Sequence, residues 1–77
     1  MIKATAEAIR AEIQRRIREQ ATDDGCSYCT APMPVRGEIN AHGSHWSVGT
    51  MQGTPLRCLH FILRIIGEVM AEYELVE

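Results

Sequence analysis

The stretch that decides the fold is residues 35–51, which read VRGEINAHGSHWSVGTM. Apolar and polar residues alternate on both sides of Gly43-Ser44, and this period of two predicts two strands. Glycine at the first central position of a two-residue loop favours a type II′ turn. The stretch therefore predicts a β-hairpin with its tip at Gly43-Ser44.

Pairing around this tip determines the two faces of the hairpin. His42 is expected opposite His45, and a slip of one residue would mix apolar and polar side chains on both faces. The face predicted to be buried comprises Ile39, Ala41, Trp46 and Val48. The polar face comprises Arg36, Glu38, Asn40, His42, His45 and Ser47.

Two amphipathic helices are predicted beside the hairpin, over residues 5–21 and 54–73. The first has a narrow apolar stripe at spacings of three and four residues, and Thr5 suits its N-cap. The second has apolar residues over nearly half of its circumference, with Thr54 as the cap and Pro55 at the first position. So wide a stripe exceeds what one hairpin and one narrow helix cover. Either this helix is therefore central to the fold, or it also packs against a second copy of the chain.

These elements predict an α+β fold in two layers, in which one face of the hairpin packs on two amphipathic helices. Residues 1–77 are expected to form a single domain, because a chain this short holds one hydrophobic core at most. The predicted order is helix, a loop over residues 22–34, hairpin and helix. Two strands are marginal alone, so a homodimer or short extra strands at residues 26–31 or 74–77 are expected to complete the sheet.

The candidate site chemistry lies in Cys26-x2-Cys29, followed after twelve residues by His42-x2-His45. Zinc prefers four sulfur and nitrogen ligands, and the predicted hairpin places the two histidines side by side. One structural zinc ion on these four residues is therefore one interpretation. In a second interpretation Cys26 and Cys29 are ordinary thiols and the chain binds no cofactor. In a third interpretation the two cysteines are a redox pair that forms a Cys26–Cys29 disulfide. Cys58 falls in the apolar stripe of the second helix and is predicted to be a small core residue.

Composition restricts the function classes. The net charge of −2 is unlike the strongly basic face of most nucleic-acid binders. No nucleophile with an orienting partner is evident, and a chain this small has little volume for a deep pocket, so we do not expect an enzyme. Residues 1–20 are too charged for a signal peptide, and no apolar run is long enough for a membrane span. The odd number of cysteines fits a secreted disulfide framework poorly. These observations predict a cytoplasmic protein.

The functional prediction is a small, non-catalytic interaction or regulatory protein of the accessory or inhibitor type, which binds a protein partner and forms a homodimer. The alternative is a zinc-stabilised, nucleic-acid-associated module with arginines of the first helix on phosphates. The third hypothesis is a thiol redox factor. The residues predicted at the interaction surface are Arg10, Arg15 and Arg18 of the first helix, Arg36, Glu38, Asn40 and Ser47 of the hairpin, and Phe61 of the second helix.

Overall fold

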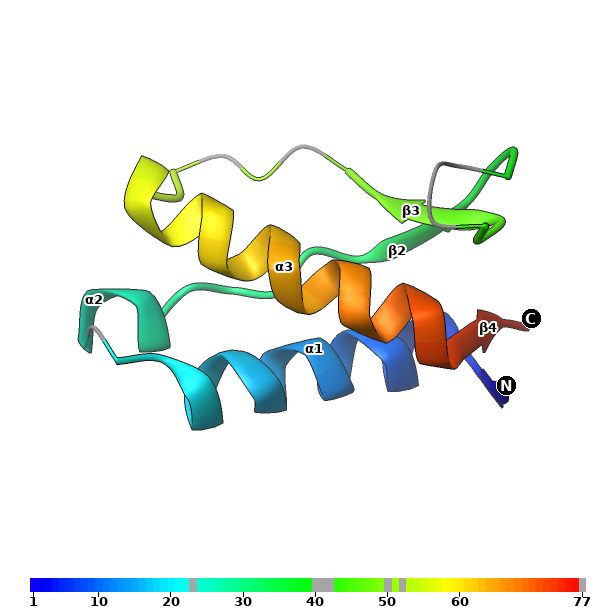
Figure 1. Ribbon diagram of the computed structural model, residues 1–77, viewed down its shortest axis with the longest axis horizontal. Coiled ribbons are helices and arrows are strands. Elements are labelled where there is room, and N and C mark those ends of the chain that lie inside the picture. Colours follow the sequence, from blue (N-terminus) through cyan, green and yellow to red (C-terminus); the bar gives the residue numbers. More distant parts are fainter. Residues whose placement is uncertain (23, 40–42, 50, 52, 77) are drawn as a thin grey trace.

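A computed structural model describes residues 1–22, 24–39, 43–49, 51 and 53–76. Helices α1 and α3 lie side by side and run antiparallel, and the β2–β3 hairpin lies along the same pair (Figure 1). The predicted α+β fold is confirmed. The elements in chain order are β1 (Ile2–Ala4), α1 (Ala6–Gln20), α2 (Asp24–Ser27), β2 (Pro34–Arg36), β3 (Trp46–Val48), α3 (Leu56–Glu72) and β4 (Tyr73–Leu75).

Helix α1 forms where its capping residue and apolar spacing predict it. The hydroxyl oxygen of Thr5 accepts a hydrogen bond of 3.2 Å from the backbone N–H of Ala8, which satisfies one of the unpaired amides of the first turn. Ile9, Ile13 and Ile17 follow at intervals of four and are completely buried. This stripe is the contribution of α1 to the hydrophobic core.

Helix α3 begins later than the sequence predicts. Pro55 occupies the N-cap position with extended backbone angles, so the predicted cap at Thr54 is wrong. The fixed φ of proline suits this position, and the Pro55 carbonyl accepts hydrogen bonds from the backbone N–H groups of Cys58 and Leu59. Six residues of α3 are buried in the core: Cys58, Ile62, Ile65, Ile66, Val69 and Met70.

The hairpin is present, but its predicted register is wrong. Arg36 pairs with Trp46, and the next hydrogen bond joins the N–H of Gly37 to the carbonyl of His45 at 2.8 Å. His45 therefore faces Gly37 and not His42. Gly43 has the predicted positive φ of 75°, but it lies in a longer connection between the strands.

This shift changes which residues the hairpin buries. Trp46 is completely buried and Val48 half-buried, as predicted, whereas Ile39 is 75% exposed. Strand β2 ends at Arg36, so Ile39 lies beyond the paired strand, in the connection to β3, and the strand pairing does not direct its side chain into the core. Ala41, like Asn40 and His42, lies outside the described residues.

The observed register is explained by contacts of the hairpin with β4. The indole Nε1–H of Trp46 donates to the Tyr73 carbonyl at 3.0 Å, and Arg36 Nη2 donates to the Leu75 carbonyl at 3.1 Å. The ring Nε2 of His45 also lies 3.1 Å from the Leu75 carbonyl. In this register Arg36 lies beside Trp46, and both side chains reach the same strand. Tertiary hydrogen bonds therefore determine the pairing, and not the two-residue turn.

A parallel pair of strands joins the two ends of the described chain. Ile2 pairs with Tyr73 and Ala4 with Leu75, and the N–H of Val76 donates to the Ala4 carbonyl at 2.8 Å. Strand β4 overlaps the extra strand considered for residues 74–77, whereas β1 was not predicted. None of the described helices is both long and apolar enough to cross a bilayer.

Candidate interaction surface around Tyr28

A disulfide joins the loop after α1 to the first turn of α3. Cys26 in α2 is bonded to Cys58 in α3, with their Cα atoms 5.3 Å apart and a sequence separation of 32. Cys58 is buried in the core as predicted, whereas its bond to Cys26 was not predicted. The Cys26–Cys29 disulfide of the redox hypothesis is wrong for this structure, because Cys26 has the other partner.

The structure does not group the described members of the predicted zinc site, Cys26, Cys29 and His45, as metal ligands. Cys26 is bonded to Cys58, so its sulfur is not a free thiolate. The His45 ring lies at the Leu75 carbonyl, and His42 lies outside the described residues. Among the described residues no three histidine, cysteine or acidic side chains are grouped as metal ligands. The set does not fit zinc in the oxidised chain, and zinc binding stays a prediction for the reduced chain.

The loop that follows α2 is fixed by side chains of α1. We call residues 28–32 the Tyr28 loop. Gln14 Nε2 donates to the Cys29 carbonyl at 2.9 Å, and Gln14 Oε1 accepts from the N–H of Ala31 at 2.8 Å. Arg10 Nε donates to the Ala31 carbonyl at 3.1 Å. The two arms of one amide thus bind the loop backbone as a neighbouring strand would.

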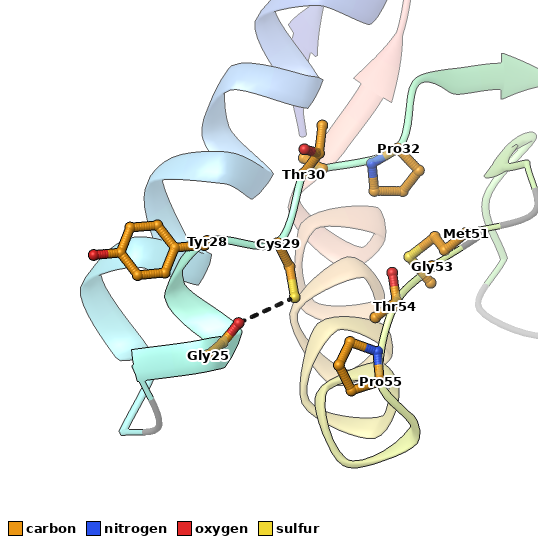
Figure 2. Close-up of a pocket in the computed structure, with 10 residues that line it drawn as sticks. Gly25, Tyr28, Cys29, Thr30, Pro32, Met51, Gly53, Thr54 and Pro55 are labelled. Atoms are coloured by element: carbon orange, nitrogen blue, oxygen red, sulfur yellow. Dashed lines mark hydrogen bonds between the residues drawn. The ribbon is translucent and has the colours of Figure 1, made fainter.

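Cys29 is the free thiol of the chain and lies half-buried in this loop. Its Sγ atom points back toward α2, 3.8 Å from the Gly25 carbonyl (Figure 2). Its backbone N–H donates to the Cys26 carbonyl at 3.1 Å, which closes a turn. The thiol is therefore held on the same turn of chain as one end of the disulfide.

Tyr28 projects from this fixed loop into solvent. Its ring points away from Pro32 and Met51, on the opposite side of the Cys29 backbone (Figure 2), and the residue is 86% exposed. Two hollows, of about 430 and 440 Å³, adjoin it. The first lies between the Tyr28 loop and the segment that leads into α3, including Met51 and Pro55. The second includes Gln14 and Arg18 of α1.

The predicted arginines of α1 have different surroundings. Arg10 is bonded to the Tyr28 loop, and Arg18 lines the second hollow beside Tyr28. Arg15 forms ion pairs with Glu12, at 2.8 Å, and with Glu19. The structure therefore brings Arg10 and Arg18 to the surface around Tyr28, whereas the charge of Arg15 is shared with carboxylates.

A small charge network connects α1 with the end of α3. Arg16 pairs with Glu12 at 2.6 Å and with Glu72 at 2.8 Å. Hydrogen bonds from Arg15 and then Arg16 lower the pKa of Glu12 to about 2, although burial acts in the opposite direction. The hydrogen bond to Glu72 is the main cause that raises the pKa of Arg16. This network has a structural role, because it fixes the two helices to each other.

The predicted residues of the hairpin and α3 do not join the surface around Tyr28. Arg36 is bonded to β4, and Glu38 and Ser47 are exposed on the hairpin, at the opposite end of the molecule (Figure 1). Phe61 is half-buried and packs against the core, with the Arg64 guanidinium carbon 5.7 Å from the ring centroid. Asn40 lies outside the described residues.

No family model matches the sequence, and searches of curated proteins and of solved structures found no similar protein. The residues themselves are therefore the basis for a functional interpretation. Sequence reasoning missed Gln14 as the residue that fixes the loop. The signal that could have pointed to it is its position one residue after Ile13, beside the buried stripe, where a polar side chain requires a partner.

Proposed function

We propose that the protein is a small, non-catalytic interaction protein that binds another protein through the Tyr28 loop. One observation carries this proposal: Tyr28 is 86% exposed on a loop whose backbone is bonded to α1 and whose preceding turn is covalently attached to α3. Folding alone does not account for a large aromatic side chain in solvent on so constrained a segment.

Two physical arguments support binding at this position. Tyrosine is enriched at protein interfaces, where it contributes a large contact area and one polar group. A loop already ordered in the free protein loses little conformational entropy on binding, which increases affinity. The hollows on either side of Tyr28 provide concave surface for partner side chains. Arg18 in the second hollow favours an acidic group on the partner.

We also propose a homodimer, with α3 as the contact between copies. Leu56 and Leu63 lie seven residues apart on one side of the helix and are 71% and 46% exposed. Their spacing of two turns places them on a common stripe, which supports the interpretation from the wide apolar surface. Sedimentation equilibrium of the wild type and of Leu63→Glu tests this part: a wild-type monomer would contradict it.

The cytoplasm remains the proposed compartment, and the disulfide is the observation that opposes it. Disulfides persist mainly in oxidising compartments, and those in the cytoplasm are usually transient. Rapid alkylation of thiols in intact cells, before lysis, tests the assignment. We expect the Cys26–Cys58 bond to be at least partly reduced there.

The zinc and nucleic-acid hypothesis has less support. Arg15 and Arg16 are paired with carboxylates, so fewer cations of α1 are available for phosphates. Elemental analysis of reduced protein, purified without added metal, tests it directly. One zinc ion per chain would support this alternative.

The experiment for the main proposal compares three baits in extracts of the source cells: the wild type, Tyr28→Ala and Ile39→Ala. Ile39 is 75% exposed at the other end of the molecule, so it is a matched control for loss of an exposed apolar side chain. We expect a protein retained by the wild type and by Ile39→Ala, with a purified-component Kd weakened about tenfold or more by Tyr28→Ala. Equal binding by all three baits would refute the proposed surface.

A further inference from the structure

The proposed function uses the Cys26–Cys58 bond only as an attachment and gives no role to the thiol of Cys29. The Cys26–Cys58 bond is buried, with Cys26 4% and Cys58 0% exposed. Dissolved thiols therefore have little direct access to either sulfur. Cys29 is a half-buried thiol on the turn that contains Cys26. It is thus the most exposed of the three cysteines, on the same turn of chain as one end of the buried bond.

We propose that Cys29 is a thiol–disulfide exchange site through which dissolved thiols open the buried bridge. The hydrogen bond from the Cys29 N–H to the Cys26 carbonyl closes a turn, and such a turn brings residues i and i+3 close together. This is the spacing of cysteine pairs that form redox-active disulfides. The regulatory meaning of the exchange rests on the proposed function of the Tyr28 loop, whereas the chemistry stands on the cysteines alone.

The exchange is balanced without an external oxidant. The Cys29 thiolate attacks the Cys26 sulfur, a Cys26–Cys29 bond forms, and the Cys26–Cys58 bond breaks. Cys58 leaves as a thiolate and takes up the proton that Cys29 released. One sulfur of the new bond belongs to Cys29, which is half-buried, so a dissolved thiol can attack the bond at that sulfur. Two such thiols then reduce it to two cysteine thiols and become one disulfide.

The exchange would alter the surface around Tyr28. One wall of the first hollow belongs to the Tyr28 loop, and the other precedes α3. The Cys26–Cys58 bond attaches the turn before this loop to the first turn of α3, so the two walls are linked covalently through it. Release of Cys58 removes that link. The protein therefore has two covalent states that differ at the proposed binding surface.

Reduction kinetics test the proposal. Wild-type protein and Cys29→Ser are treated with dithiothreitol under native conditions, quenched with acid, alkylated and weighed by mass spectrometry. We expect the bridge of Cys29→Ser to be reduced at least about tenfold more slowly, with the two rates converging in denaturant. Destabilisation by the substitution would accelerate reduction, so it cannot imitate this result. Equal native rates, or a faster variant, would overturn the proposal.

A second variant makes the test independent of the stability of Cys29→Ser. Cys58→Ser, oxidised with glutathione disulfide, is expected to form a Cys26–Cys29 bond. If both thiols instead persist or bind glutathione separately, the exchange is refuted. Neither measurement involves a partner protein, so a failure here is distinguishable from a failure of the Tyr28 binding experiment.

Discussion

Replacement of Gln14 by alanine is expected to loosen the Tyr28 loop without changing the fold. The substitution removes the donor to the Cys29 carbonyl and the acceptor for the Ala31 N–H. Each hydrogen bond contributes about 1 kcal/mol, and a buried amide left without a partner costs about 1–3 kcal/mol. Ala31 is 2% exposed, so its N–H has little access to water. We therefore expect the free energy of unfolding to fall by about 2–3 kcal/mol.

Urea unfolding and hydrogen exchange measure this effect. Gln20→Ala is the matched control, because Gln20 is an exposed residue at the end of the same helix, and we expect it to change stability by no more than about 0.5 kcal/mol. Gln14→Glu keeps an acceptor for the Ala31 N–H, so it should lower the free energy of unfolding by about half as much as Gln14→Ala. The amide of Ala31 should exchange faster in Gln14→Ala. If Gln14→Ala matches Gln20→Ala in stability, the explanation of the fixed loop is wrong.

Three further predictions concern other contacts. Trp46→Phe removes the hydrogen bond to the Tyr73 carbonyl and part of a buried ring, so urea unfolding should show a free energy of unfolding lower by about 2–3 kcal/mol. A loss below about 1 kcal/mol would contradict the role of Trp46 in fixing the register. The double variant Cys26→Ser/Cys58→Ser removes a cross-link between residues with a sequence separation of 32, and the chain-entropy model gives a loss of about 3–4 kcal/mol in the free energy of unfolding relative to the oxidised wild type. Reduction of the wild type should reproduce this loss. The folded-state pKa of Glu12 is lowered to about 2, so the stabilisation by its carboxylate is complete above about pH 4.5 and is lost as the pH falls toward 2. Glu12→Gln should reduce the free energy of unfolding at pH 7 by about 1–2 kcal/mol and flatten this acid dependence. Thermal unfolding between about pH 2 and pH 7 measures both effects.

The fold was predictable to the extent that local patterns determine it. The spacing of Ile9, Ile13 and Ile17 defines the buried stripe of α1, and the alternation around Trp46 and Val48 identifies the second strand. These features depend on side chains close together in sequence, where period and propensity act directly. The same reasoning identified Thr5 as the N-cap of α1, because a hydroxyl just before an amphipathic helix can accept a hydrogen bond from a backbone N–H of the first turn.

The remainder depends on contacts between residues far apart in sequence. The hairpin register is determined by the β4 carbonyls that accept from Trp46 and Arg36, and no pattern within the hairpin contains that information. The parallel pairing of β1 with β4 likewise joins opposite ends of the described chain.

The candidate site illustrates the same limit. The motif Cys26-x2-Cys29 directs attention to a local pair, whereas the actual partner of Cys26 is on α3. Cys26 and Cys58 belong to the same buried core, and this proximity arises from the tertiary fold and not from the spacing of the motif. The position of Gln14 beside the buried stripe indicates that its amide needs a partner, but no pattern along the helix identifies the Tyr28 loop as that partner.

The most direct measurement is the disulfide map of the oxidised protein. Free thiols are alkylated without reduction, and the chain is digested with trypsin and chymotrypsin, since cleavage after Tyr28 separates Cys26 from Cys29. We expect the peptide that contains Cys26 to be linked to the peptide that begins at Cys58, with the alkyl group on Cys29. A Cys26–Cys29 bond as the main product, or three alkylated cysteines, would contradict the attachment of the Tyr28 loop to α3.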